Sequence, residues 1–252
     1  MSWSNTCDRI IVFFDIMGFK NLVYNSPHID VLHKMEKLSR IVKVIDEHKF
    51  KDEDKELLVK ATTFSDSIII ISENDTIASA KNIMLVSSFI MDFCFEESIP
   101  IKGCVAHGKL TADFDKSLFF GKPLIEAFLL HEELNMYSVI LHHTFEAFFI
   151  DKKISGIRFS EDKRWIKYST PLICGKSKHY HINWLWYTDH LEDKDKKIKT
   201  RNQDGINKLN DSIKRFKLTT SGLQRMYVDN TEDFINEAID QLVGESETNK
   251  NG

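Results

Sequence analysis

The feature that most constrains the fold of this chain is an apolar run that ends in an acid. Residues Ile10–Phe14 read IIVFF, which is typical of a strand buried on both faces. Asp15 follows at once, and Gly18 comes three residues later. We therefore expect Asp15 to lie at the edge of a sheet, where the chain turns.

A second aspartate stands in a comparable place. Two β-rich runs, Leu57–Thr63 and Ser67–Ser72, flank the short segment FSD and predict a hairpin whose turn contains Asp66. In a β-α-β-β unit, the first strand lies beside the hairpin in the sheet. The end of that strand and the hairpin turn then share one edge, so the sequence predicts that Asp15 and Asp66 converge.

Helical and strand patterns alternate along the first 150 residues. The other elements predicted there are helices near 29–48, 76–97 and 124–134 and strands near 101–107, 110–120 and 137–141. The resulting order is β-α-β-β-α-β, followed by α-β. This order predicts an α+β fold of the ferredoxin-like, split βαβ type.

The pattern beyond residue 150 is less regular. It predicts one or two strands within 163–186, a charged loop at 189–199, and helices near 204–216 and 231–243. The aromatic residues Trp184, Trp186 and Tyr187 are assigned to the end of a late strand, as packing residues. We expect residues 1–150 to form a catalytic-type domain and 151–244 a C-terminal α/β elaboration packed on it. The polar segment 245–252 is predicted to be a disordered tail.

Composition excludes several classes of protein. A chain of 252 residues that is 42% apolar supports one sizeable core, and a net charge of −4 offers no basic field for duplex nucleic acid. The first residues, MSWSNTCDR, lack signal-peptide features, and the longest nearly apolar run, Ile83–Phe95, is too short to span a bilayer. The four cysteines show no metal-ligand spacing. We expect a cytoplasmic protein with reduced thiols that binds neither nucleic acid nor membrane.

Two converging carboxylates repel each other unless a cation lies between them. A hard divalent cation with oxygen ligands and substrate phosphates is the usual solution. Gly18 would let the backbone between Asp15 and Lys20 turn its amides toward a polyphosphate. This layout is typical of two-metal phosphoryl transfer. The alternative is that each aspartate is an ordinary turn residue or helix cap.

Four segments resemble, in order, motifs of the class III nucleotidyl cyclases. FFDIMGF resembles the metal-binding strand of that family, F-x-D-I-x-G-F, and FSDSIIII resembles the hairpin with its second metal aspartate. IPIKGCVAHGKL resembles the following strand, and FFGKPLIEAFLLHEEL resembles the segment that runs into the next helix. The resemblance covers about Arg9 to Leu141. It implies the class III cyclase palm fold and a nucleotidyl cyclase activity.

The resemblance also implies roles for single residues. Asp15 and Asp66, with the carbonyl of Ile16, would hold two Mg²⁺ or Mn²⁺ ions. One ion would lower the pKa of the ribose 3′-hydroxyl and the other would carry the triphosphate. The 3′-oxygen would attack the α-phosphorus, and pyrophosphate would leave.

Substrate contacts are expected from five further residues. Gly18, Phe19 and Lys20 would form the phosphate turn, although Lys20 is equally consistent with the exposed start of a helix. Lys102 would contact base or phosphate, of its own site or of the partner subunit's, or else would be a strand lysine that faces solvent. Thr62 would touch the base through its hydroxyl, or would be an ordinary β-branched strand residue.

At two places the sequence departs from the motifs of the adenylate and guanylate cyclases. Ile125 and Leu129 occupy positions where adenylate and guanylate cyclases of the family carry the Asn that orients the ribose and the Arg that stabilises the transferring phosphate. Thr62 stands where adenylate cyclases place a purine-reading Lys. The combination most resembles the pyrimidine cyclases of the bacterial Pycsar anti-phage systems. That resemblance implies a homodimer with sites at its interface, which makes cyclic UMP or cyclic CMP from UTP or CTP to activate a separate effector protein.

Other functions remain open at this stage. The chain is also consistent with an ordinary adenylate or guanylate cyclase. The loss of the polar pair at Ile125 and Leu129 favours a catalytically inactive nucleotide-binding module instead. A third alternative is another palm-type nucleotidyltransferase, although the GGDEF signature of dinucleotide cyclases is missing. The residues do not distinguish uracil from cytosine.

Overall fold

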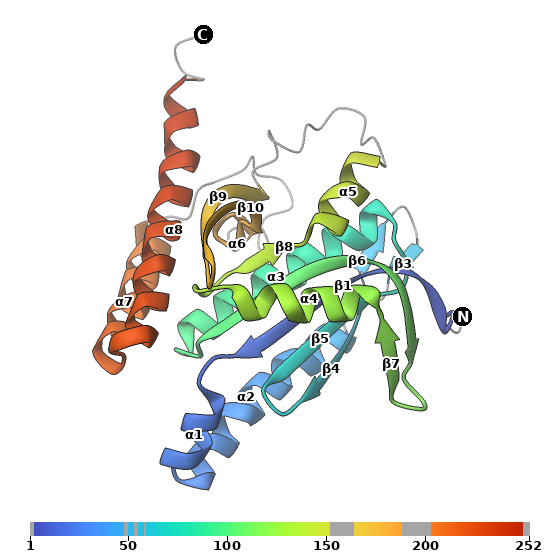
Figure 1. The fold of residues 1–252 in the computed structure, drawn as a ribbon, viewed down its shortest axis with the longest axis horizontal. Coiled ribbons are helices and arrows are strands. Elements are labelled where there is room, and N and C mark those ends of the chain that lie inside the picture. Colours follow the sequence, from blue (N-terminus) through green and yellow to red (C-terminus); the bar gives the residue numbers. More distant parts are fainter. Residues whose placement is uncertain are drawn as a thin grey trace.

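A computed structural model describes residues 3–47, 50–52, 55–57, 59–151, 164–187 and 203–248. Most strands join one sheet in the order β4-β5-β1-β6-β8-β10-β9, and β7 pairs with β6 outside that path (Figure 1). These strands are β1 (Thr6–Ile16), β4 (Val59–Phe64), β5 (Ser67–Ser72), β6 (Ile101–Asp113), β7 (Leu118–Gly121), β8 (Val139–Leu141), β9 (Trp165–Leu172) and β10 (Gly175–Ile182). A separate hairpin contains β2 (Phe50–Asp52) and β3 (Lys55–Leu57).

The helices lie between and after these strands. They are α1 (Phe19–Asn25), α2 (His28–Glu47), α3 (Ile77–Glu96), α4 (Lys122–Glu133), α5 (His143–Asp151), α6 (Trp184–Tyr187), α7 (Gln203–Thr219) and α8 (Gly222–Thr248). The predicted helices near 29–48, 76–97, 124–134 and 204–216 are therefore present within a few residues. The short helix α1 corresponds to one of the two alternatives for Lys20, the exposed start of a helix, and its extent was not predicted.

The first half of the chain forms the predicted ferredoxin-like core. β1 pairs antiparallel with β5 on one side and with β6 on the other, and β4 pairs antiparallel with β5. The order β6-β1-β5-β4, with α2 and α3 in the two crossovers, is that of a split βαβ fold. The α+β fold class is thus confirmed, with β1 at the centre of the core.

β1 is apolar on both sides because helices cover both of its faces. Side chains alternate along a strand, so Phe13 and Asp15 point to one face and Phe14 and Ile16 to the other. Phe13 packs on Phe128 of α4, with ring centroids 5.5 Å apart. α4 therefore covers the face toward which Asp15 points. α3 also packs against β1, and residues Ile10–Phe14 are all buried.

α3 is the most apolar helix and is buried by several neighbours. It packs on β1 and β5 and also touches α6 and α7. Eleven of its residues are buried, from Ser79 to Phe95. By length and composition alone α3 could cross a membrane, but more than half of its apolar window lies inside the protein. Its hydrophobicity is therefore accounted for by packing in the core.

The C-terminal elements continue the sheet and add two helices at one end of it. β10 pairs with β8 and β9, and α7 and α8 pack together and lie side by side in Figure 1. Two sequence predictions were wrong here. Trp184–Tyr187 is the short helix α6 rather than the end of a strand, and α8 runs to Thr248, so residues 245–248 are helical. The predicted loop at 189–199 and the last four residues lie outside the described part.

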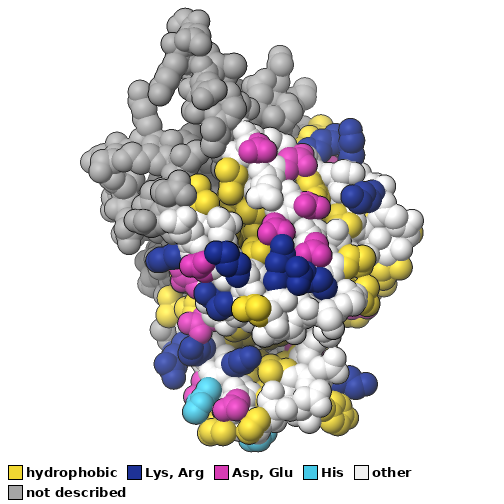
Figure 2. Space-filling model, turned by 90° about the vertical axis from the view of Figure 1, so that its left-hand side faces the viewer, with side chains coloured by type: hydrophobic (Ala, Val, Ile, Leu, Met, Phe, Trp, Pro, Cys, Tyr) yellow, Lys and Arg dark blue, Asp and Glu magenta, His cyan; other side chains and the backbone are white. Residues whose placement is uncertain are grey.

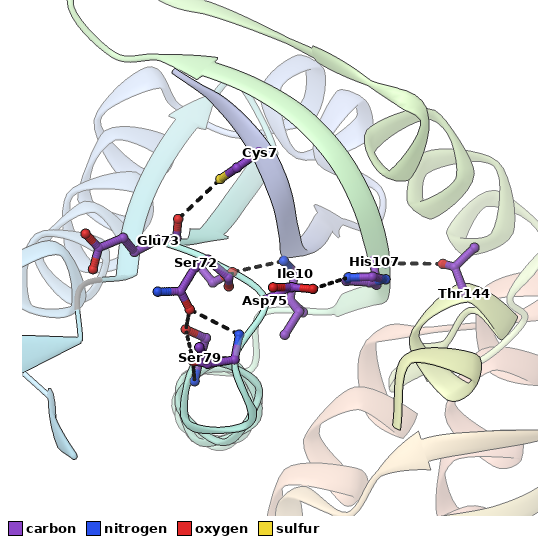
Figure 3. Close-up of polar contacts among 10 residues, drawn as sticks. Cys7, Ile10, Ser72, Glu73, Asp75, Ser79, His107 and Thr144 are labelled. Atoms are coloured by element: carbon purple, nitrogen blue, oxygen red, sulfur yellow. Dashed lines mark hydrogen bonds and ion pairs between the residues drawn. The ribbon is translucent and has the colours of Figure 1, made fainter. Parts of the chain in front are cut away.

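Polar contacts tie the strands together at the end of β1 that is remote from Asp15 (Figure 3). The Ile10 N–H donates to the Ser72 hydroxyl at 2.9 Å and so links β1 to β5. His107 Nε2 lies 3.3 Å from the Asp75 carboxylate, and the His107 N–H donates to Thr144 Oγ1. These bonds join β1 to the end of β5 and β6 to the starts of α3 and α5, which is a structural role.

Candidate active site

The structure brings Asp15 and Asp66 to one edge of the sheet, as predicted. Asp15 is the penultimate residue of β1 and lies opposite Ser67, the first residue of β5. The Ile16 N–H donates to the carbonyl of Asp66 at 3.0 Å, which extends the ladder into the hairpin turn. The register of two antiparallel strands therefore fixes the relative position of the two acids.

The turn that carries Asp66 is tight and holds an unusual backbone. Ser65 and Asp66 alone separate β4 from β5. Ser65 has φ of 56°, in the left-handed region that glycine adopts most easily. Glycine would meet this requirement at no steric cost, whereas this chain meets it with serine.

A row of side chains crosses the sheet at the level of Asp15. Direct partners on neighbouring strands point to the same face, and the registers pair Phe64 with Ser67, Ser67 with Asp15, and Asp15 with Lys102. Thr62 lies two residues before Phe64 and so shares that face. Four polar residues therefore lie on the face of the sheet that α4 partly covers. They are Asp15, Lys102, Ser67 and Thr62.

Burial and neighbouring charges shape the electrostatics of Asp15. Its burial, reinforced by the charge of Asp66, raises the pKa of Asp15 to about 6, although Lys102 acts in the opposite direction. A raised pKa means that the surroundings of Asp15 disfavour its ionised, negatively charged form. A bound cation would offset that cost.

Lys102 is buried rather than exposed to solvent. Only 3% of its surface is accessible, and its ammonium donates to the carbonyls of Leu134 (3.0 Å) and Glu132 (3.3 Å). It also lies 5.5 Å from the ring centre of Tyr227. Burial lowers the pKa of Lys102, while Glu132 and Asp15 act to raise it. The lysine is therefore fixed at the end of α4, close enough to Asp15 for their charges to interact.

The segment after Asp15 turns as Gly18 predicted. Gly18 has φ of 71° and precedes the first residue of α1. The Met17 N–H donates to the carbonyl of Pro100 at 2.8 Å, so the turn is tied to the start of β6. Phe19 is half-buried and Lys20 is exposed. Both belong to α1, which agrees with the reading of Lys20 as the start of a helix and leaves its phosphate role a proposal.

Three residues near the site were missed by sequence reasoning. Ser67 lies directly opposite Asp15. The sequence SDS, in which Ser67 follows Asp66, was the signal that could have pointed to it. Glu132 acts on the charges of both Asp15 and Lys102. Tyr227 comes from α8, far beyond the segment that resembles the cyclases. No local pattern could have linked it to Lys102.

The chemistry of the donor set fits divalent cations of the hard type. Within the described residues no group of three or more His, Cys, Asp and Glu side chains is placed to hold a metal. The predicted set is smaller, with two carboxylates and one backbone carbonyl, and leaves room for substrate phosphates. The unfavourable burial of Asp15 is the observation that favours a cation there.

The apolar residues Ile125 and Leu129 of α4 are both exposed to solvent. Ile125 is 60% accessible and Leu129 57%, and Phe128 between them is 45% accessible. Leu118 and Phe120 of the neighbouring strand β7 are also about half exposed. This group of five, termed here the α4–β7 apolar surface, comprises the large apolar residues of α4 and β7 that are at least 45% accessible.

Comparison with known proteins gives no matching family model and no matching curated protein. Among solved structures, a bacterial light-regulated adenylyl cyclase aligns over 83% of this chain and 100% of its own, with 10% identity and a TM-score of 0.47. The catalytic core of a rhodopsin-guanylyl cyclase with converted specificity, in complex with ATPαS, aligns over 71% of this chain and 98% of its own, with 15% identity and a TM-score of 0.49. At these values the likenesses carry no argument about function.

Proposed function

We propose that this chain is a nucleotidyl cyclase, a phosphorus–oxygen lyase that converts UTP or CTP into the 3′,5′-cyclic nucleotide and pyrophosphate. The observation that carries the proposal is the convergence of Asp15 and Asp66 at one sheet edge, beside the turn at Gly18. The four ordered motifs in the sequence support the same reading. The fold alone would not, since ferredoxin-like domains serve many functions.

In this reaction the ribose 3′-hydroxyl loses its proton and its oxygen bonds to the α-phosphorus. The bond from the α-phosphorus to the oxygen that bridges to the β-phosphate breaks. Mg²⁺ or Mn²⁺, when bound, would supply the positive charge that stabilises the 3′-oxygen and the phosphates. Asp15, Asp66 and the carbonyl of Ile16 would hold the two ions.

The remaining predicted residues would position the substrate. The backbone of Gly18, Phe19 and Lys20 would face the triphosphate, because the first amides of a helix lack helical acceptors. Lys102, fixed by the carbonyls of α4, would add a positive charge beneath the acids. Thr62 would contact the base. Its short hydroxyl in place of a long purine-reading Lys is the basis for proposing a pyrimidine.

The proposal includes a homodimer. The α4 part of this surface, Ile125, Phe128 and Leu129, belongs to the helix that covers the Asp15 side of the sheet, and an exposed apolar group of this kind marks a protein contact. A second copy that covers it would also enclose the open face of Thr62 and Asp15. A two-fold related pair buries the same surface on both subunits. We further propose that the protein is cytoplasmic and that its product acts on a separate effector in defence against phage.

The test is product formation. The purified protein is incubated with ATP, GTP, CTP and UTP separately, with Mn²⁺, and products are identified by mass spectrometry. An Asp66→Ala variant removes a proposed metal ligand, and Asp8→Ala removes an exposed acid at the other end of β1. We expect cyclic UMP or cyclic CMP from the wild type and from Asp8→Ala, with at least a hundredfold loss in Asp66→Ala.

Each other result points to a named alternative. Cyclic AMP or cyclic GMP would identify an ordinary purine cyclase. Products that join two nucleotides would identify another palm-type transferase. Nucleotide binding without turnover would favour an inactive module, the candidate supported by the apolar residues Ile125 and Leu129.

A further inference from the structure

A cleft of about 780 Å³ opens at the end of the molecule where α1 and α2 meet α7 and α8. The segment Ile16–Phe19 forms one wall, α2 contributes Met35 and Leu38, and the C-terminal helices close the other side. Neither Asp15 nor Asp66 lines it. The cleft is thus next to the candidate active site but separate from its carboxylates.

The lining has the composition of a small-molecule site. Most of it is aliphatic or aromatic, and Tyr137, Phe216 and Tyr227 form an aromatic side. Tyr137 lies 5.4 Å from Phe216 and 6.0 Å from Tyr227, between ring centroids. Sites for small ligands typically have 300–1,000 Å³ of space, apolar walls and a few polar groups. This cleft meets each of those conditions.

The charged groups among the described residues of the cleft are positive. Lys34 and Arg215 line it, and no Asp or Glu of the described part of the chain does. Arg215 is held by three hydrogen bonds, from Nε to Ser98 Oγ (2.9 Å) and from Nη2 to the Glu96 carbonyl (3.1 Å) and Ser212 Oγ (2.8 Å). Its Nη1 makes no hydrogen bond to a described residue. A positioned guanidinium edge of this kind favours a carboxylate or a similar anion.

Figure 2 looks onto this end of the molecule, where Lys and Arg side chains lie among Asp and Glu side chains. Among the described residues that line the cleft itself, the charged ones are Lys34 and Arg215. At the mouth, Leu218 is 86% and Leu223 67% accessible, so apolar surface extends from the cleft into solvent. A ligand that matched both features would have an apolar body and a negatively charged group.

We propose that this cleft binds a small amphipathic anion, an aromatic or aliphatic body that carries one acidic group. The apolar walls would hold the body, and Lys34 and Arg215 would pair with the anion. A nucleoside triphosphate does not fit this description, because its several charges would lie against apolar walls. The cleft therefore borders the substrate site proposed above, with which it shares Ile16, Gly18 and Phe19 but neither carboxylate, and its ligand does not depend on the cyclase activity.

The test uses two dyes with one ring system. 8-Anilinonaphthalene-1-sulfonate carries an anion, and N-phenyl-1-naphthylamine lacks it. Both are titrated by fluorescence into the full chain and into Lys34→Gln and Arg215→Gln. Lys37→Gln is the matched control, because Lys37 lies one turn further along α2, pairs with Glu97 and does not line the cleft. Thermal unfolding of each variant checks the fold.

We expect one saturable site for the anionic dye. Its Kd should rise at least fivefold in Lys34→Gln and in Arg215→Gln and less than twofold in Lys37→Gln, while the neutral dye binds all four proteins equally. Thr220→Phe, which fills the cleft from the residue that follows α7, should weaken the binding of both dyes. The proposal is overturned if a folded Lys34→Gln protein binds the anionic dye like the wild type, or if a folded Thr220→Phe protein does so. It is also overturned if UTP with Mn²⁺ displaces the dye from the wild type but not from Asp66→Ala, since the cleft would then be part of the substrate site.

Discussion

Asp15 is a proposed metal ligand whose pKa is shifted by its partial burial. Burial and Asp66 raise its pKa to about 6 from an ordinary 3.8. The metal-free native state therefore keeps a proton that the unfolded chain has lost, and its free energy of unfolding falls as pH rises from about 4 to 6. Asp15→Asn should abolish this fall. Without metal, we expect its Tm to exceed that of the wild type by about 2–4 °C at pH 7.5 and to equal it at pH 4, measured by calorimetry.

Added Mn²⁺ should give the wild type the higher Tm at pH 7.5, because only the wild type retains the proposed carboxylate ligand. Asp8→Asn is the control, since it removes an exposed carboxylate from the same strand. Equal Tm values for Asp15→Asn and wild type across the whole pH range would show that Asp15 is not held in an unfavourable environment.

Ser65 provides a second test at the scale of one residue. Its φ of 56° is costly for a residue with a Cβ, by about 1–2 kcal/mol. Glycine removes that cost but has more freedom in the unfolded chain, so Ser65→Gly should raise the free energy of unfolding by a net of about 0.5–1 kcal/mol. Urea unfolding measures this change. Ser67→Gly, two residues on and within β5, should instead lower stability, and the same sign for both variants would contradict the argument.

At the scale of the element, α4 has one face on the sheet and another in solvent. Phe13 packs on its inner side, whereas Ile125 and Leu129 are more than half exposed. If a second copy covers this surface, Leu129→Glu places a charge in an apolar contact. We expect the dimer Kd from sedimentation to rise at least tenfold. Ile173→Glu alters an apolar residue that is 71% exposed elsewhere and should leave the Kd unchanged. A wild type that stays monomeric at 50 µM would exclude the homodimer.

At the scale of the whole molecule, His181 joins the C-terminal strands to the core. It is fully buried in β10, 3.0 Å from Ser138 Oγ and 2.7 Å from Thr170 Oγ1 of β9. His181→Leu would leave both hydroxyls buried without this partner, and we expect it to cost about 2–4 kcal/mol in urea unfolding. His179→Leu, on the same strand and only half-buried, should cost less than about 1 kcal/mol.

The pH dependence of stability gives an independent readout. Burial, with His179 nearby, lowers the pKa of His181 to about 3, whereas the unfolded chain titrates near 6.5. The unfolded state therefore binds the proton first, and stability falls as pH drops below about 6.5. His181→Leu should show a shallower fall between pH 6.5 and 4. An unchanged slope would mean that His181 does not stay neutral in the folded protein.

The sequence by itself determined the ferredoxin-like order and the meeting of Asp15 with Asp66. Both follow from local patterns, because apolar runs, turn residues and a β-α-β-β order leave few arrangements open. The glycine at position 18 likewise predicted a turn, since few residues other than glycine adopt its φ of 71°. The short helix α6 was misassigned because aromatic residues favour strands and buried helices alike, and four residues show no period.

Only the tertiary structure decided what surrounds the two acids. The burial of Lys102 depends on carbonyls of α4 and on Tyr227, which lies 125 residues further along the chain. The cleft beside Gly18 likewise exists because α7 and α8 lie across from α1 and α2 and line it together with them. Such contacts join segments that are remote in sequence, and their energy depends on shape and desolvation rather than on any local pattern. The amino-acid sequence therefore predicts where the two acids lie. Tertiary packing determines the pKa of Asp15, the lysine beside it and the cavity next to the site.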